Sequence, residues 1–323
     1  MEARDDNIAA KSEIVREAGG AGMIVIDKRD ATQVRFDAYA VPISVIGLQQ
    51  GMQLEEYITT SSNPFAIISP TEAVLNTKPA PTMAYFSKQA PNAITPDVIK
   101  VILLHFHVCT SCYRRSFYNP SYKQKMECCR HKSAIMTTAI VNDNIGGPIQ
   151  SGAGPATPFD FGSGHLESDL ALSPGLVYDF DENDLLDFLC YHITNDYDYY
   201  KFSNMVGRNV VCKSPPVPPY QLNYPSIAIL SLDRPVSVRR TVTFVASRNG
   251  PKFYRASIEP PEGVDVTVEP QVLDFSHGEE NLSYTVHFTP LRVAPGYAYT
   301  FGSITWSDGN QHRVRSPIAV RVV

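Results

Sequence analysis

After Leu222 the chain alternates between apolar and polar side chains, and this period-two pattern constrains the fold more than any other feature. The pattern recurs in four runs separated by turn-forming residues, although Arg239 and Arg240 interrupt the first run. Successive side chains of a β-strand point to opposite faces, so each run predicts a strand with one buried face. Several such strands within about 100 residues are typical of a β-sandwich. The apolar positions are Val236, Val238, Val242 and Phe244; Val264, Val266 and Val268; Tyr284, Val286 and Phe288; and Ile318, Val320 and Val322.

The expected sandwich is preceded by the segment Pro-Pro-Val-Pro-Pro at residues 215–219. A proline-rich stretch of this kind is a stiff spacer and indicates a domain boundary. We therefore place the all-β domain at residues 214–323. Trp306 and Tyr299 fall within its alternating strands, and we expect them to be part of its core.

Residues 9–70 follow a different pattern, in which helical and strand periods alternate. The spacing predicts a helix over 9–18 that the pair Gly19-Gly20 ends, strands over 23–26 and 42–46, a helix over 48–60, and a last apolar run over 65–68 that closes the unit. A phosphate-binding loop runs from strand through glycines to helix. The order here is helix, glycines, strand, so no nucleotide site is expected.

Charge and hydropathy exclude several classes of protein. The 323 residues carry 28 Lys and Arg against 33 Asp and Glu, a net charge of −5, without the basic excess of a nucleic-acid-binding protein. The longest apolar runs, such as residues 101–104, are far shorter than the roughly 18 residues that span a membrane. Residues 1–6 are polar and acidic and no apolar stretch follows them, so we expect no secretory signal in this chain, which is then cytosolic or part of a longer precursor.

Residues 101–131 differ in character from the sequence on either side. They hold Cys109, Cys112, Cys128, Cys129 and His131 with no clear periodicity. A structural zinc site needs two well-spaced ligand pairs, and adjacent cysteines rarely both bind one ion. The favoured interpretation is foreign sequence that replaces a lost block, with a zinc site and disulfides as the alternatives.

Several blocks carry a family resemblance, and they occur in the family's order. They are Ala18–Val25, Phe86–Asn92 (Phe-Ser-Lys-Gln-Ala-Pro-Asn), Lys132–Ala139, Phe159–His165, Ser173–Asp179, Leu222–Ser226, Arg240–Thr243 and Arg315–Ile318. Together they resemble the C-terminal portion of plant-type subtilisin-like serine proteases. The resemblance implies a multidomain α/β plus all-β chain: a protease-associated α/β domain (1–78), an incomplete, truncated subtilisin-like peptidase remnant (79–213, with 101–131 as an atypical insert) and a C-terminal fibronectin type III-like β-sandwich (214–323).

The same resemblance implies peptide-bond hydrolysis through an acyl-enzyme, with polypeptide substrates and no cofactor. The family's Asp and His blocks and its oxyanion-hole Asn precede the protease-associated domain, and no Gly-Thr-Ser-Met-Ser block occurs before Lys132. A subtilisin-type triad needs all three groups. We therefore expect no catalytic, cofactor-binding or metal-binding residue in this chain and no protease activity from it alone.

Four further features of the sequence are candidate sites. Ser163 lies between two glycines but lacks the spacing of a nucleophile elbow, so a glycine loop is expected. The acidic cluster at residues 179–187 lacks a calcium-loop pattern, and carboxylates at a helix N-terminus have an electrostatic role. Cys190 and Cys212 could pair if the protein is secreted and are free thiols if it is cytosolic. Asn281-Leu282-Ser283 is a possible N-glycosylation sequon that matters only after secretion.

The alternative to a protease is a noncatalytic protein-interaction module or a nonfunctional gene fragment. By the resemblance, the protease-associated domain can support self-association, and the location is extracellular or vacuolar. Neither nucleic acid nor a membrane is expected as a partner.

Overall fold

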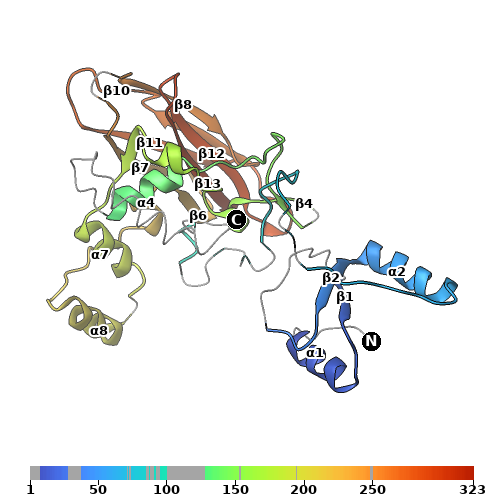
Figure 1. Ribbon diagram of the computed structural model, residues 1–323. Helices are drawn as coiled ribbons and strands as arrows, with labels where there is room; N and C mark the ends of the chain where they lie inside the picture. The colour runs from blue at the N-terminus through green and yellow to red at the C-terminus, as the bar shows by residue number, and fades with distance from the viewer. Residues whose placement is uncertain are drawn as a thin grey trace. The chain divides into compact units, whose positions relative to one another are not determined.

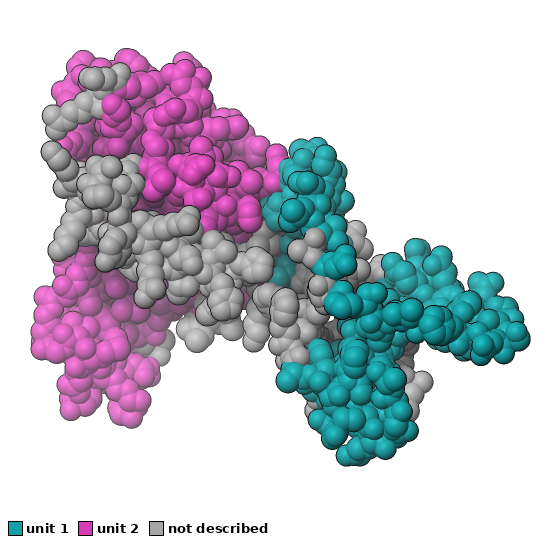
Figure 2. Space-filling view, viewed as in Figure 1, with its two compact units in different colours: residues 1–86, 143–155 teal, residues 87–142, 156–323 magenta. Residues whose placement is uncertain are grey.

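The computed structural model describes residues 8–27, 38–70, 72, 74–84, 87, 91, 95–99, 128–152, 154–193, 195–247 and 250–323. The chain divides into two compact units, residues 1–86 with 143–155 and residues 87–142 with 156–323 (Figure 2). Cys109, Cys112 and the rest of residues 100–127 lie outside the described residues, so the interpretation of this insert is not tested.

The first unit holds a two-stranded parallel sheet with a helix on each side of it in sequence. Its elements are α1 (Ile8–Glu17), β1 (Met23–Asp27), β2 (Ile43–Gly47) and α2 (Leu48–Thr60), with a short hairpin of β3 (Gln150–Ser151) and β4 (Gly154–Pro155) (Figure 1). Met23 pairs with Ile43 and Asp27 with Gly47. Gly51 permits α2 to lie close to β1, since a Cβ there would be 2.5 Å from Ile26. Both expected helices and both strands are confirmed.

The expectation for residues 65–68 is wrong. This run forms neither helix nor strand, and the side chains of Phe65 and Ile67 are 72% and 74% exposed. An apolar run of four residues predicts a strand only when a neighbouring strand edge and a covering layer are available. The outer edges of β1 and β2 are unpaired, but the exposed side chains of Phe65 and Ile67 show that no layer of the described residues covers the run.

The second unit is built on a sandwich of two sheets, seen as the large β-rich body in Figure 1. One sheet has the order β10-β8-β12-β13-β6 and the other the order β5-β7-β11-β9. Neighbouring strands are antiparallel except β6 and β13, which are parallel. The strands are β5 (Leu176–Tyr178), β6 (Ile227–Leu232), β7 (Val236–Phe244), β8 (Phe253–Glu259), β9 (Val264–Glu269), β10 (Val272–Asp274), β11 (Asn281–Pro290), β12 (Thr300–Ser307) and β13 (Arg313–Val322), with 3₁₀ turns η1 (Pro219–Gln221) and η2 (Pro295–Tyr297).

The four alternating runs form β7, β9, β11 and β13, as expected, and their inward residues make one core. Trp306 is fully buried and its ring meets Tyr284 edge-on at 4.9 Å between centroids, so its expected place in the core is confirmed. Tyr299 is half-buried and packs against Phe159.

The two arginines that interrupt the first run do not break the alternation. Arg239 points outward, and Arg240 takes the next inward position with 2% of its surface exposed. Its guanidinium donates to the backbone carbonyls of Tyr220, Tyr224, Ser226 and Arg239 at 2.9–3.2 Å. Burial lowers the pKa of Arg240 to about 10. The position keeps the strand period because carbonyl oxygens solvate the charge in place of water.

The described part of the second unit also contains the helices α4 (Cys128–Thr137), α5 (Pro158–Phe161), α6 (Ser168–Ala171), α7 (Glu182–Cys190) and α8 (Asp196–Val206). The capping residues and apolar spacing over 179–192 predict a helix with Leu185, Leu186, Phe188 and Leu189 buried, and α7 confirms the helix. Its expected buried face is partly wrong, because Leu185 is 42% exposed while Leu186, Phe188 and Leu189 are only half-buried. None of the helices in the described ranges is long and apolar enough to cross a bilayer.

Candidate functional site

Helix α4 is fixed to the sandwich through strand β5. The helix is buried along most of its length, from His131 and Ser133 to Met136 and Thr137. The Ser133 Oγ accepts the backbone N–H of Tyr178 at 2.8 Å, in a buried position. Because β5 pairs with β7, this bond connects α4 directly to the four-stranded sheet.

The ring of Tyr178 extends this connection across the core. Its hydroxyl lies 2.6 Å from the hydroxyl of Tyr284 on β11 and 2.9 Å from Ser316 Oγ on β13. Burial is the main cause that raises the pKa of Tyr178. The motif Ser173–Asp179 therefore supplies a strand and a polar core residue to the sandwich.

A serine, a histidine and an aspartate are joined by hydrogen bonds at the start of that motif. His312 Nε2 lies 3.2 Å from Ser173 Oγ, and His312 Nδ1 lies 2.6 Å from Asp308 Oδ2. The side chains of His312 and Asp308 are 6% and 0% exposed, whereas Ser173 is exposed. Burial raises the pKa of Asp308, but hydrogen bonds from the backbone of Asn310 and from His312 outweigh this and lower it. We call these residues the Ser173–His312–Asp308 relay.

The order of groups in this relay is the one that activates serine nucleophiles. Hydrolysis also needs donors for an oxyanion and a concave seat for the substrate. A hollow beside Asp308 is also lined by Tyr254 and Ser307, and neither Ser173 nor His312 is among the described residues that line it. The relay is therefore interpreted as a connection between the β12–β13 hairpin and the turn before β5.

The packing around the relay supports this interpretation. Gly175 has φ +79°, and a Cβ there would lie 2.7 Å from Tyr254 Oη and 2.8 Å from the Cβ of His312. No other residue fits this close approach without displacing its neighbours.

Ser163 is placed in a glycine loop, as expected. Gly162 and Gly164 have φ of +70° and +136°, and a Cβ on Gly164 would lie 2.4 Å from the carbonyl oxygen of Ile140. Ser163 is 1% exposed, so its hydroxyl cannot meet a substrate from solvent.

The acidic cluster begins a helix, also as expected. Asp181 Oδ1 accepts the backbone N–H of Asp184, and Asp184 Oδ2 accepts that of Asp181, which is a reciprocal capping box. The bond from Asp184 lowers the pKa of Asp181. In the described part of the chain, no group of three or more His, Cys, Asp or Glu side chains is placed to hold a metal ion.

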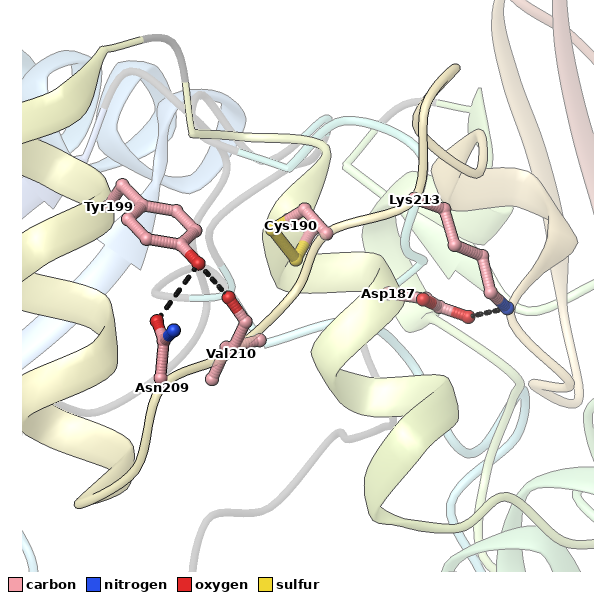
Figure 3. Close-up of a disulfide and its surroundings, with 7 residues drawn as sticks. Asp187, Cys190, Tyr199, Asn209, Val210 and Lys213 are labelled. Atoms are coloured by element: carbon pink, nitrogen blue, oxygen red, sulfur yellow. Dashed lines mark hydrogen bonds and ion pairs between the residues drawn. A yellow bond between two sulfur atoms is a disulfide. The ribbon is translucent and has the colours of Figure 1, made fainter.

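Cys190 and Cys212 form a disulfide, which joins the end of α7 to the segment after α8 (Figure 3). Beside it the Tyr199 hydroxyl donates to Val210 O, and Lys213 pairs with Asp187. Among the described residues of α7, α8 and the segment that follows α8, the buried cluster consists of Cys190, Phe202 and Val210. A cluster this small depends on a covalent link more than a large core does.

Asn281 begins β11 and is exposed. Its Oδ1 accepts the Thr243 hydroxyl at 2.6 Å, and the Ser283 hydroxyl lies 2.8 Å from Thr241 Oγ1. The two polar residues of the sequon thus share one face and both contact β7. Asn281 also lines a groove together with Arg130, Asp179 and Phe180.

Known proteins match the chain along nearly its whole length. A subtilisin-like serine-protease S of Lotus japonicus is 37% identical over 98% of this chain and 45% of its own length. From Arabidopsis thaliana, the subtilisin-like proteases SBT5.3 and SBT1.7 are 32% and 34% identical over 97% and 96% of this chain. The chain is a relative of plant subtilisin-like proteases. The family model of the fibronectin type-III domain matches residues 221–320, which contain β6 to β12 and most of β13.

This subtilisin-like chain spans less than half the length of those relatives, 44% and 45% of the two Arabidopsis proteins. The contacts of the Ser173–His312–Asp308 relay were not predictable from the sequence, because 139 positions separate Ser173 from His312. One local signal for the Asp308–His312 pair is present in the sequence. Asp308 lies in the turn Asp308-Gly309-Asn310, four residues before His312 at the start of a strand.

Proposed function

We propose that this chain is the noncatalytic C-terminal part of a subtilisin-like serine protease whose substrates are polypeptides. The anchoring of α4 on the sandwich carries the proposal. The block Lys132–Ala139 resembles the peptidase-domain helix that follows the nucleophile block, and Ser133 binds it to β5. The sandwich would then act as a rigid support for the peptidase segment.

A second contact fits this role. Arg130 Nε lies 2.5 Å from Asp179 Oδ2, and the backbone carbonyl of Asp179 accepts from the side chain of Asn223. Asn223 also exchanges two hydrogen bonds with the backbone of Thr241 on β7. Helix α4, the turn after β5 and the sheet are therefore held by one continuous network.

In this proposal residues 1–78 form a protease-associated domain, 79–213 an incomplete peptidase segment and 214–323 the fibronectin type III-like domain. The protein is extracellular or vacuolar, since a disulfide such as Cys190–Cys212 persists in oxidising compartments.

The test is reaction of the purified full chain with a serine-directed fluorophosphonate probe and with an unfolded protein substrate. We expect no labelled serine and no cleavage, with an active subtilisin-like protease as the positive control. Stoichiometric labelling of any serine would show that the chain carries its own nucleophile, and labelling at Ser173 would assign that role to the relay.

A second candidate function is self-association through the first unit. Met52, Tyr57 and Ile58 on α2 are 62%, 42% and 51% exposed, and Phe65 and Ile67 follow them. Exposed apolar surface of this kind is typical of an interaction site. Sedimentation of the full chain tests it: a dimer that Met52→Lys with Ile58→Lys converts to a monomer supports self-association, and a wild-type monomer at all concentrations contradicts it.

A further inference from the structure

The groove beside Asn281 lies on the outer face of the four-stranded sheet, within the second unit. It has a volume of about 450 Å³. We define the sequon groove by six of its lining residues, Arg130, Asp179, Phe180, Thr241, Thr243 and Asn281. These six residues combine one aromatic ring with an ion pair, two hydroxyls and a carboxamide, and the rest of the lining is polar or charged, namely Asp181, Asp184, Gln221, Asn223 and Arg239.

The carboxamide of Asn281 is held in one orientation. Its Oδ1 accepts from Thr243, so Nδ2, on the opposite side of the carboxamide, is the atom left for attachment of a sugar. The hydroxyl of Ser283, which the sequon requires, lies on the same face two residues later. The folded strand therefore presents a complete Asn-x-Ser sequon at the rim of a concave surface.

The lining of the groove suits a saccharide. Sugar-binding surfaces offer an apolar face for the C–H groups of the ring and polar groups for its hydroxyls. Phe180 supplies an aromatic side chain that is only half-buried, with its neighbour Tyr224 at 6.4 Å between ring centroids. Arg130 and Asp179 keep 31% and 24% of their side-chain surface exposed, and because Asp179 Oδ1 is buried, Oδ2 and the guanidinium are the groups that a bound molecule can reach.

We propose that Asn281 carries an N-linked glycan whose first N-acetylglucosamine lies in the sequon groove. In the transfer step Nδ2 loses a proton and forms a bond to C1 of the sugar, while the bond from C1 to the diphosphate oxygen of a lipid-linked oligosaccharide donor breaks. The lipid diphosphate leaves with the electron pair of the broken bond, and the proton from Nδ2 passes to solvent. The ring then rests against Phe180, and its hydroxyl and acetamido groups meet Arg130 and Asp179.

This inference rests on the proposed passage through an oxidising, secretory compartment. The test therefore uses the full chain behind a heterologous secretion signal in a eukaryotic host, so that a different natural location does not affect it. Attachment is measured by intact mass before and after an amidase that removes N-glycans. We expect wild type to lose the mass of one glycan, and Asn281→Gln and Ser283→Ala to show no change.

Asn204→Gln is the matched control, because Asn204 is exposed on α8 and belongs to no sequon. It should keep the glycan. A wild-type chain secreted without any glycan overturns the proposed modification.

The position of the sugar in the sequon groove is tested separately from its attachment to Asn281. The thermal midpoint of wild type and of each variant is measured with the glycan attached. It is measured again in the same chain carrying Asn281→Gln, which has no glycan. We expect the glycan to raise the midpoint of wild type by about 2–4 °C, the shift that roughly 1 kcal/mol produces in a unit of this size. In Phe180→Ala the glycan should raise the midpoint by less than half as much.

Phe188→Ala is the control for the loss of an aromatic ring, since Phe188 lies on α7 and does not line the groove. It should keep the full glycan-dependent shift. An equal shift in wild type and in Phe180→Ala shows that the sugar points into solvent, and the proposed seat is then wrong.

Discussion

His312 lies 2.6 Å from Asp308 through Nδ1, and the same imidazole lies 3.2 Å from Ser173 through Nε2. It therefore links the turn between β12 and β13 to the residues that lead into β5. Asp308 also accepts the backbone N–H groups of Asn310 and His312. The turn is thus closed by one carboxylate that receives hydrogen bonds from three donors.

Replacing His312 by Ala should destabilise the second unit. The change leaves the buried Asp308 without its side-chain donor, and an unsatisfied buried group costs about 1–3 kcal/mol. The free energy of unfolding in urea measures this loss. His277→Ala is the control, because His277 also faces an aspartate, at 3.7 Å, but is 82% exposed. A loss no larger than that of the control contradicts the proposed link.

The lowered pKa of Asp308 predicts a pH dependence with a definite sign. Its folded-state pKa lies below the unfolded value of about 3.9, so the carboxylate contributes stability above that value. This contribution is lost as the pH falls below about 4 and the folded carboxylate takes up its proton. Urea unfolding between pH 2.5 and 6 should show a smaller loss of stability for Asp308→Asn than for wild type. Identical pH profiles would contradict it.

Arg240 should be the arginine on which the sandwich depends most. Arg240→Ala removes donors to four backbone carbonyls and opens a cavity, so we expect a loss of about 3 kcal/mol or more. Arg240→Lys should recover only part of it, because an ammonium cannot reproduce the geometry of the guanidinium. Thermal unfolding of these variants is compared with Arg239→Ala, whose side chain is exposed on the same strand. Equal effects at both positions would show that the carbonyl contacts contribute nothing.

The Cys190–Cys212 disulfide should stabilise the α7–α8 pair rather than the sandwich. Closing a loop of 22 positions stabilises a chain by roughly 3 kcal/mol. In Cys190→Ser with Cys212→Ser, amide exchange should accelerate in α7 and α8 and stay unchanged in β7 and β11, which serve as the internal control. Acceleration throughout the sandwich would show that the helical pair is coupled to it.

Local patterns predicted those parts of the fold that depend on neighbours in sequence. The bounds of α2 agree with the expected helix over 48–60, and the alternating runs became β7, β9, β11 and β13. Contacts between distant segments were not predictable in this way. Strand β5 has three residues, too few for a periodicity, and its pairing with β7 joins positions 66 apart, as between Val177 and Thr243.

The candidate sites show the same difference between local patterns and contacts of distant segments. Asn281 was found because a sequon is contiguous, and the capping of α7 because its signal lies within four residues. The groove beside Asn281 was not predictable, since Arg130, Phe180 and Thr243 come from three separate segments. The burial of Arg240 was not predictable either, because here the charge is stabilised by backbone carbonyls that converge on it, and that convergence is a property of the tertiary fold.

The bond between Ser133 and Tyr178 gives a direct test of how α4 is held. Ser133→Ala leaves the buried N–H of Tyr178 without an acceptor, and the expected loss is about 1–3 kcal/mol. Thr138→Val is the matched control, because the Thr138 hydroxyl is also buried but donates only to the carbonyl of Ala134 one turn earlier in the chain. Amide exchange adds the spatial readout: in Ser133→Ala, protection should fall in α4 and at Tyr178, while β12 and β13 keep theirs. If Ser133→Ala is no more destabilising than Thr138→Val and exchange at Tyr178 is unchanged, α4 is held by apolar packing alone, and the sandwich does not support the peptidase segment through this bond.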